Sequence, residues 1–244
     1  MDSGYYAAYS GLLARSQALD LAAGNLANAG TAGYRAERDY FSSAVMGPQA
    51  LGSQLNTTVN DFGVLGGSQL DFSQGALTPT GNPLDLAIEG QGFFAIQTKH
   101  GIRYTRDGQF VRAPDGTLTT QAGEAVLDAK NKPIRIPAGN IVIGPDGSVS
   151  VNGAIAGKIA LSGFSSPAAL TAEGADRYVA AAGAKPQAAS GAIRQGALEA
   201  SNQNVIEGSL QLILMQRQAE MMQKAVSIFS NDFDKTASED LPRV

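Results

Sequence analysis

The N-terminal region carries large apolar residues at a regular helical spacing. They recur every seven positions, at Tyr5, Leu12, Leu19 and Leu26. Seven residues complete nearly two turns of an α-helix, so these side chains share one face and predict an amphipathic helix over about residues 3 to 28. The helix is expected to end at Asn28–Ala29–Gly30, because Asn and Gly suit a left-handed cap.

The C-terminal region repeats this spacing more strongly over residues 204 to 230. Its apolar residues form three columns: Val205, Leu212, Ala219 and Val226; Met215, Met222 and Phe229; Leu214, Met221 and Ile228. On a helix these columns cover an apolar arc of roughly 160°, wider than a two-stranded coiled-coil seam. The arc predicts more than one neighbour for this helix, although packing of the two terminal helices inside one domain explains much of the same pattern.

Short runs of β-branched and aromatic residues, separated by Gly, Asp and Pro, occupy the middle of the chain. Asp107–Gly108, Pro114–Asp115–Gly116 and Pro145–Asp146–Gly147 each stand between two such runs. Asp-Gly favours hairpin turns because both residues tolerate positive φ. The pattern predicts an all-β domain of hairpins over residues 78–178. The expected fold class is α+β, with paired, coiled-coil-like N- and C-terminal helices and a central all-β domain.

The remaining segments suggest how these parts are joined. Residues 1–40 and 198–235 are expected to form one terminal-helix domain that mediates assembly. Residues 41–77, rich in Gly, Ser, Gln and Asn, predict an extended arm, and the Ala- and Gly-rich residues 179–197 predict a linker. A chain that folds back and brings its two ends together is the simplest arrangement of these four parts.

Composition narrows the possible functions. The 244 residues include 18 basic and 22 acidic side chains, a net charge of −4, with no basic stripe suited to nucleic acid or an anionic membrane. Cysteine is absent and His100 is the single histidine, which disfavours disulfides, metal sites and cysteine or Ser-His-Asp catalysis. Only 16% of residues are charged, against about 25% in typical soluble domains, as expected of a surface covered in an assembly.

Neither a membrane span nor a cleaved secretory signal is predicted. No stretch approaches the roughly 20 apolar residues that a spanning helix needs. The opening Met1–Asp2–Ser3–Gly4 lacks the basic and apolar regions of a cleaved signal peptide. If the protein leaves the cytoplasm, we expect it to use another route.

Candidate catalytic residues are few. Asp85 and Glu89 lie four residues apart in a strand-like run, which places them about 13 Å apart on one face. His100 falls between two predicted strands and is expected to be a solvated hairpin residue. We expect no enzyme activity, no metal, no cofactor and no small-molecule substrate. Two alternatives of other classes are a secreted binding module oligomerised by its helices, and a glycan hydrolase acting through Asp85 and Glu89.

Three segments, in order, resemble the rod, hook and hook-basal body family of the bacterial flagellum. The first is NLANAGTAGYR at residues 25–35, the second is GALTPTGNPLDLAIEGQGFF at 75–94 with YTRDG at 104–108, and the third is GALEASNQNV at 196–205, followed by Gln216–Arg217. Within the family the chain looks most like a proximal rod protein, with a distal rod or hook-type subunit as the alternative.

The resemblance implies a structural subunit of the basal-body rod. Family members pair their terminal helices, pack them against neighbouring subunits to build a helical tube, and place the β domain outside. The implied partners are copies of the same chain, neighbouring rod proteins and the flagellar export apparatus, which takes the chain without a cleaved signal peptide to the periplasmic rod. The implied motif residues are Asn25, Asn28, Thr31, Gly33, Tyr34, Ser201, Asn202, Asn204, Gln216 and Arg217.

The apolar columns supply the residues expected at subunit interfaces: Tyr5, Leu12, Leu19, Leu26, Val205, Leu212, Met215, Met222 and Phe229. A lone helix of this length is marginally stable in water, so we expect the helices to order only when they dock at the growing rod. On this reading Leu212→Asp abolishes incorporation and leaves the β domain folded.

Overall fold

A computed structural model describes residues 2–42, 64–174 and 176–239. The chain divides into two compact units. The helical unit comprises residues 1–26, 37–69 and 205–244, and the β unit comprises residues 27–36 and 70–204. The segment that follows the first helix and the segment that precedes the last one therefore both belong to the β unit.

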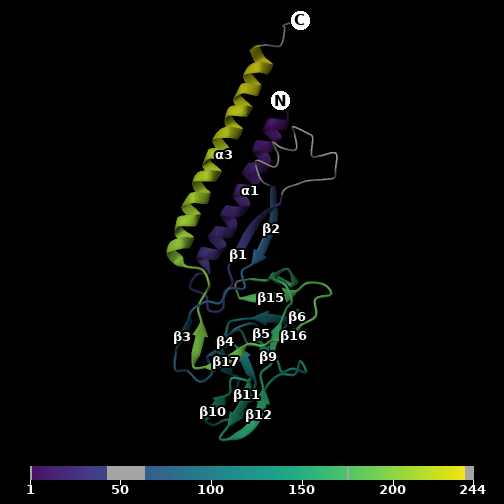
Figure 1. Cartoon of the computed structure of the whole chain (residues 1–244), viewed down its shortest axis with the longest axis vertical. Coiled ribbons are helices and arrows are strands. Elements are labelled where there is room, and N and C mark those ends of the chain that lie inside the picture. Colours follow the sequence, from purple (N-terminus) through teal and green to yellow (C-terminus); the bar gives the residue numbers. More distant parts are fainter. Residues whose placement is uncertain (1, 43–63, 175, 240–244) are drawn as a thin grey trace. The chain divides into compact units, whose positions relative to one another are not determined.

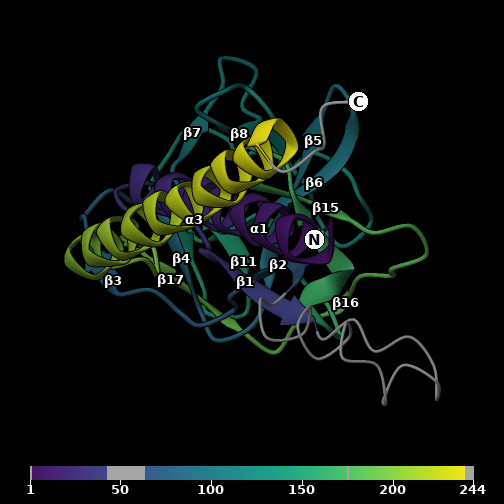
Figure 2. The ribbon, with the colours of Figure 1, turned by 90° about the horizontal axis from the view of Figure 1, so that it is seen from above.

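The helical unit contains two long helices, α1 (Asp2–Ala27) and α3 (Val205–Glu239), which lie side by side in Figures 1 and 2. On α3 the heptad-spaced Leu212, Met215, Ala219, Met222 and Val226 are half-buried, as in a seam between paired helices. This confirms the predicted pairing of the terminal helices. The last helix runs past the expected end at residue 230, because no Gly or Pro interrupts the chain before Pro242.

A two-stranded sheet of β1 (Glu37–Ser42) and β2 (Val64–Leu70) completes the helical unit. Both strands fall in or beside residues 41–77, where we expected an extended arm, so part of that segment is paired. Residues 43–63 of the expected arm lie outside the described residues.

The β unit is built from short strands. They are β3 (Leu77–Pro79), β4 (Leu86–Glu89), β5 (Phe93–Thr98), β6 (Gly101–Thr105), β7 (Phe110–Arg112), β8 (Leu118–Thr120), β9 (Ala125–Val126), β10 (Ile141–Ile143), β11 (Ser148–Val151), β12 (Ala154–Lys158), β13 (Leu161–Gly163), β14 (Leu170–Ala172), β15 (Arg177–Ala180), β16 (Gln187–Ala188), β17 (Ala192–Gln195) and β18 (Ala197–Glu199). A 3-10 turn, η2 (Pro167–Ala169), precedes β14. The central β-rich domain of the expected α+β fold is confirmed.

Strand β5 lies at the centre of the largest sheet. This nine-stranded sheet has the order β14-β15-β6-β5-β9-β8-β7, with β13 pairing to β5 and to β16. Successive side chains of a strand point to opposite faces. Phe94 and Ile96 accordingly enter one buried apolar cluster, and Phe93 and Ala95 enter another. The sheet is therefore covered on both faces, which explains the nearly continuous apolar run of β5.

Two of the three predicted hairpin turns are confirmed. Pro114–Gly116 joins the antiparallel pair β7 and β8, Pro145–Gly147 joins β10 and β11, and both glycines have positive φ. The prediction for Asp107–Gly108 was wrong, because β6 and β7 pair with other strands. Instead the Gly108 carbonyl accepts a hydrogen bond from the Leu86 amide, 3.0 Å away, and a Cβ on Gly108 would lie 1.6 Å from the Leu86 carbonyl oxygen.

The expected linker at residues 179–197 contains strands rather than free chain. Strand β17 pairs with β4 from Ala192↔Glu89 to Gln195↔Leu86, and β16 pairs with β13. Ile193 is buried in the larger apolar cluster. Ala and Gly carry little propensity signal, so this pairing depends on distant partners and on one buried side chain.

Candidate functional site

A buried group of three charged side chains lies where the three family-like segments meet. Glu199, at the end of β18, accepts hydrogen bonds from Nη2 of Arg35 at 2.6 Å and from Nη1 of Arg106 at 2.9 Å. The Gly75 amide donates to the same carboxylate at 2.9 Å. All three charged residues are at most 3% exposed. We call Arg35, Arg106 and Glu199 the Arg–Glu–Arg cluster.

The cluster carries two positive charges against one negative charge. Burial, followed by repulsion from Arg35, lowers the pKa of Arg106, whereas Glu199 raises it. Arg106 also donates to the Gly90 carbonyl at 2.6 Å and lies over the Phe93 ring, 5.3 Å from its centroid. An arginine stays charged in proteins, so Glu199 is the group that makes burial of both guanidinium groups tolerable.

Motif side chains hold the segment that leaves α1. The Asn202 amide accepts from the Ala36 amide at 2.7 Å and donates to the Asp71 carbonyl at 2.9 Å. Within the helical unit, Asn25 both accepts from the Glu37 amide at 2.9 Å and donates to its carbonyl at 2.7 Å. These amides replace the ladder partners that residues 36 and 37 would have in a regular sheet.

The Tyr178 hydroxyl accepts from the Arg35 backbone amide at 3.0 Å. Burial raises the pKa of Tyr178, so its hydroxyl remains protonated. The phenol therefore adds no charge beside the Arg–Glu–Arg cluster and serves as a neutral hydrogen-bonding partner for the segment after α1.

Gly33 brings two of the segments into backbone contact. Its amide donates to the Glu199 carbonyl at 2.8 Å, and a Cβ there would lie 2.2 Å from the Arg106 carbonyl carbon. Gly33 has φ +69°, whereas Asn28 and Gly30 lack positive φ, so the left-handed residue lies beyond the expected cap. At the helix end the Thr31 hydroxyl instead donates to the Asn28 side chain at 3.2 Å.

Asp107 follows Arg106 and is only partly exposed. Burial, with smaller contributions from the nearby carboxylates of Asp176 and Asp85, raises the pKa of Asp107 to about 6. The Gln109 amide opposes this shift by donating to Oδ1 at 3.0 Å. The turn after β6 therefore holds a carboxyl group that takes up a proton near neutral pH.

Of the remaining motif residues, Tyr34 is buried in the β unit, and the Ser201 hydroxyl accepts from the Gln203 amide at 3.1 Å. Asn204, Gln216 and Arg217 are exposed, the last two on α3.

The expected interface residues fall into three groups. Half-buried in the helical unit are Leu12, Leu19, Leu26, Leu212, Met215 and Met222, and Val205 is 56% exposed. The side chains of Tyr5 and Phe229 lie outside the described residues.

A second apolar face of α3 is exposed. It is formed by six large side chains, each between 49% and 73% exposed: Ile206, Leu210, Ile213, Leu214, Met221 and Ile228. At 100° per residue these side chains point away from the half-buried heptad line. We call this set, with Arg217 and Lys224 between its members, the outward face of α3. The heptad columns of the sequence included only Leu214, Met221 and Ile228 of this face.

Of the two candidate catalytic residues, Asp85 has structural partners and Glu89 is exposed. Asp85 accepts hydrogen bonds from the Thr80 hydroxyl at 2.7 Å and the Asn82 amide at 2.8 Å, which fixes the turn before β4. Glu89 is exposed at the end of β4. Asp85 thus has the role of a turn-stabilising group, and its two oxygens are already occupied.

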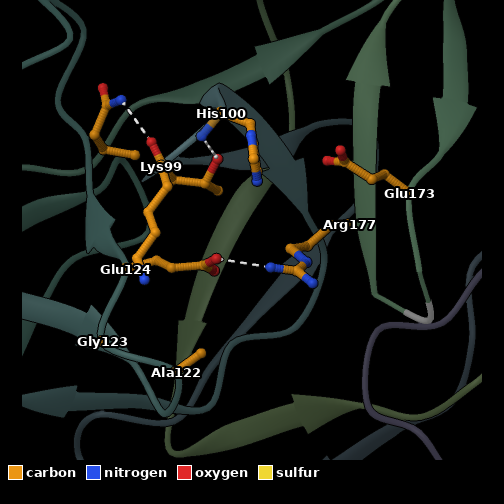
Figure 3. A pocket seen from close by; sticks show the side chains of 9 residues that line it. Lys99, His100, Ala122, Gly123, Glu124, Glu173 and Arg177 are labelled. Atoms are coloured by element: carbon orange, nitrogen blue, oxygen red, sulfur yellow. Dashed lines mark hydrogen bonds and ion pairs between the residues drawn. The ribbon is translucent and has the colours of Figure 1, made fainter.

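His100 is exposed in the β5–β6 hairpin, as predicted, and lines a surface pocket. Figure 3 shows this pocket, in which Arg177 donates to Glu124 at 2.7 Å. Glu173 at the rim pairs with Arg103. The two acidic side chains that line the pocket are thus each paired with an arginine, and its described residues show no nucleophile activated by a base.

Among the described residues no three His, Asp or Glu side chains gather closely enough to bind a metal ion. No helix in the described ranges has the length and hydropathy to cross a bilayer.

Comparison with known proteins links the chain to flagellar proteins. Residues 6–35 match the flagella basal body rod protein family, and residues 87–151 match the flagellar hook protein FlgE/F/G D1 domain. The chain is 39% identical over 165 residues to the flagellar basal-body rod protein FlgF of Caulobacter vibrioides, covering 66% of each chain. It is 39% identical to FlgF of Rhizobium meliloti over 63% of this chain and 61% of that protein. Its match to the flagellar basal-body rod protein FlgG of Borreliella burgdorferi is 32% identical and covers 73% of both chains.

Proposed function

We propose, from the premise that this chain belongs to the flagellar basal-body rod protein family, that it is a structural subunit of the basal-body rod. The observation that carries the proposal is the outward face of α3, where six large apolar side chains are exposed in the isolated chain. Contiguous apolar surface of this kind marks an interaction site. In the rod this face is covered by neighbouring subunits.

The energetics favour coverage in an assembly. Full burial of a large apolar side chain contributes about 1.5–3 kcal/mol, so covering the half that is still exposed contributes on the order of 1 kcal/mol for each. Burial of six such side chains therefore contributes enough free energy to offset the cost of ordering a helix that is only marginally stable without a partner. Docking and final ordering of the helices are therefore coupled at the growing end of the rod.

The two apolar faces of α3 have different tasks in this proposal. The half-buried Leu212, Met215 and Met222, with Leu12, Leu19 and Leu26 on α1, fix the helix pair inside one subunit. The outward face then contacts the next subunit. Tyr5, Val205 and Phe229 complete the set of proposed contact residues.

Partners and location follow from membership of this family. We assign assembly with copies of the same chain and with other rod proteins, and location in the basal-body rod of the periplasm. Delivery by the flagellar export apparatus, without a cleaved signal peptide, is part of the same proposal. The role is structural and not enzymatic, because the relatives are named rod proteins and the Asp85 oxygens are occupied in a turn.

Incorporation into basal bodies tests the proposal. A strain lacking the gene is complemented with wild type or with Leu214→Asp/Met221→Asp, and purified basal bodies are probed with an antibody to the chain. The wild type is expected in the rod fraction with restored motility, and the variant is expected to be lost from both readouts.

The matched control is Gln223→Asp, which adds a carboxylate at an exposed position of α3 outside the outward face. Leu212→Asp, on the half-buried line, is expected to reduce helix content as well as incorporation. A Leu214→Asp/Met221→Asp variant present at the wild-type level in basal bodies would contradict assembly through this face.

A further inference from the structure

A pocket on the surface of the β unit has no part in the proposed rod function (Figure 3). Its volume is about 530 Å³, within the roughly 300–1,000 Å³ typical of sites for small molecules. Its walls come from three turns, namely those between β5 and β6, between β8 and β9, and between β14 and β15. All three turns belong to the β unit, so the pocket is formed within one compact body.

Hydrogen bonds within the turns fix the walls of the pocket. The Thr98 hydroxyl donates to the Gly101 carbonyl at 2.8 Å and accepts from the His100 amide at 3.1 Å. In the turn between β8 and β9, the Gly123 amide donates to the Thr120 carbonyl at 2.9 Å. These turns are shaped before a ligand arrives, which lowers the entropic cost of binding.

Acidic and basic side chains gather around the pocket. Arg177 donates to Glu124 at 2.7 Å, and Nη2 of Arg103 donates to Glu173 at 3.1 Å. Hydrogen bonds from Arg103 lower the pKa of Glu173. The nearby His100 and Arg177 contribute to the same shift. The imidazole of His100 therefore lies near Glu173, and Figure 3 shows it pointing towards Arg177.

The pocket holds donors without partners beside acceptors with spare capacity. The side-chain nitrogens of Lys99 and His100 make no hydrogen bond or ion pair with any residue that the structure describes. Oε2 of Glu124 has only a long contact, 3.5 Å, with the Thr120 hydroxyl. A carboxylate oxygen has two lone pairs, so each paired acid can still accept from a further donor.

The charges around the pocket balance. With His100 uncharged, three basic and three acidic side chains line it or pair with its lining: Lys99, Arg103, Arg177, Glu124, Glu173 and Asp176. Such a balance gives little net attraction for an ion. Among the described residues that line the pocket there is no Phe, Tyr, Leu, Ile, Val or Met, so an apolar ligand would bury little surface against it.

We propose that this pocket binds a saccharide. Carboxylates only accept hydrogen bonds and ammonium groups only donate them, whereas a sugar hydroxyl does both. Adjacent hydroxyls on one ring donate to the two carboxylates and accept from Lys99 and His100. Saccharide binding is a second function of the β unit, and it does not depend on the assignment of the chain to the rod.

An amide NMR titration of the full-length chain tests the proposal. The probes are two neutral saccharides, maltotriose and triacetylchitotriose, together with sodium glucuronate and sodium phosphate. At least one neutral saccharide is expected to shift the amide signals of Lys99, His100 and Gly123, with a Kd in the range of about 0.1–10 mM.

Two variants remove the site in different ways. Lys99→Ala/His100→Ala deletes both free donors and is expected to weaken saccharide binding at least about tenfold, because each donor makes a hydrogen bond to a hydroxyl. Ala122→Trp, at an exposed position of the lining, fills the pocket and is expected to abolish binding. The matched control is Lys130→Ala, at an exposed lysine outside the pocket, and circular dichroism verifies the fold of each variant.

The outcomes separate the possibilities. Binding of a neutral saccharide that is lost in both site variants and kept in Lys130→Ala supports the proposal. No shift with either neutral saccharide, or equal affinity of the wild type and Lys99→Ala/His100→Ala, overturns it. Shifts with glucuronate and phosphate alone also overturn it and identify an anion site instead. None of these results alters the proposed rod function, which incorporation into basal bodies tests separately.

Discussion

Glu199→Gln is the most informative single change in the β unit, because it removes one charge and almost no volume. In the wild-type protein the two carboxylate oxygens are divided between partners. Oε1 accepts from Arg35 and from the Gly75 amide, and Oε2 accepts from Arg106. A glutamine keeps an oxygen for the first pair but presents an N–H donor to Arg106, which is a donor as well.

The cost follows from burial. After the change two guanidinium groups, 1% and 3% exposed as residues, share a dry site without a counter-charge. Loss of one member of a buried ion pair typically costs 3–5 kcal/mol because the remaining charge stays desolvated. We expect the free energy of unfolding of the β unit to fall by about 3–5 kcal/mol, a large part of the roughly 5–15 kcal/mol available to a domain.

Urea unfolding of the full-length chain measures this loss. The chain has no tryptophan, so near-ultraviolet circular dichroism of the buried Tyr34, Tyr104 and Tyr178 reports on the β unit. With an m-value of about 2 kcal/mol per molar urea, the midpoint is expected to fall by about 1.5–2.5 M.

The matched control is Glu173→Gln, the same substitution at a carboxylate that pairs with Arg103 and keeps 45% of its side chain exposed. An exposed pair contributes less than about 1 kcal/mol, so this midpoint is expected to move little. If Glu199→Gln shifted the midpoint no more than Glu173→Gln does, the buried cluster would not be a principal stabilising element.

Two further predictions concern the turns beside the cluster. Gly33→Ala is expected to destabilise the β unit by at least about 2 kcal/mol in the same urea assay, because Gly33 has a positive φ and a Cβ there would lie 2.2 Å from the Arg106 carbonyl carbon. The control is Gly30→Ala, which is expected to be nearly neutral because the space around its Cβ is open. Asp107 has a pKa near 6 in the folded chain against 3.8 when unperturbed, so the folded state binds the proton more tightly and stability rises as pH falls from about 7 towards 4. Asp107→Asn keeps the oxygen that accepts from Gln109 and is therefore expected to raise the midpoint at about pH 7.5 but not at about pH 4; equal shifts at both values would show that ionisation is not the cause.

Several features could be predicted from the sequence because they depend on local order. The seven-residue spacing of apolar side chains fixed the two long helices, since periodicity within one helix decides which side chains share a face. The Pro-Asp-Gly turns at 114–116 and 145–147 formed hairpins for an equally local reason, a glycine with positive φ. The family-like segments were also continuous stretches of sequence.

Only the tertiary structure decided which distant residues meet. Arg35, Arg106 and Glu199 belong to three separated segments, and nothing in their immediate neighbours marks a shared site. Each family-like segment does contain a charged residue, which is notable in a chain that is only 16% charged. This signal does not show that the three residues contact one another. Asp107–Gly108 has the same turn signal as the two hairpins and yet contacts β4, because the pairing of β6 and β7 is set by the whole sheet.

The same distinction applies to the helices. Heptad spacing determined that α3 is apolar over a wide arc, but it gave no means of telling which part faces α1 and which part faces outward. That choice follows from packing within the helical unit, which half-buries Leu212, Met215 and Met222 and exposes Leu214 and Met221. Sequence by itself therefore determined the two long helices, the local hairpin turns and the family. The fold decided which side chains form the buried cluster and which are exposed for a partner, because contacts between distant residues exist only after the chain has packed.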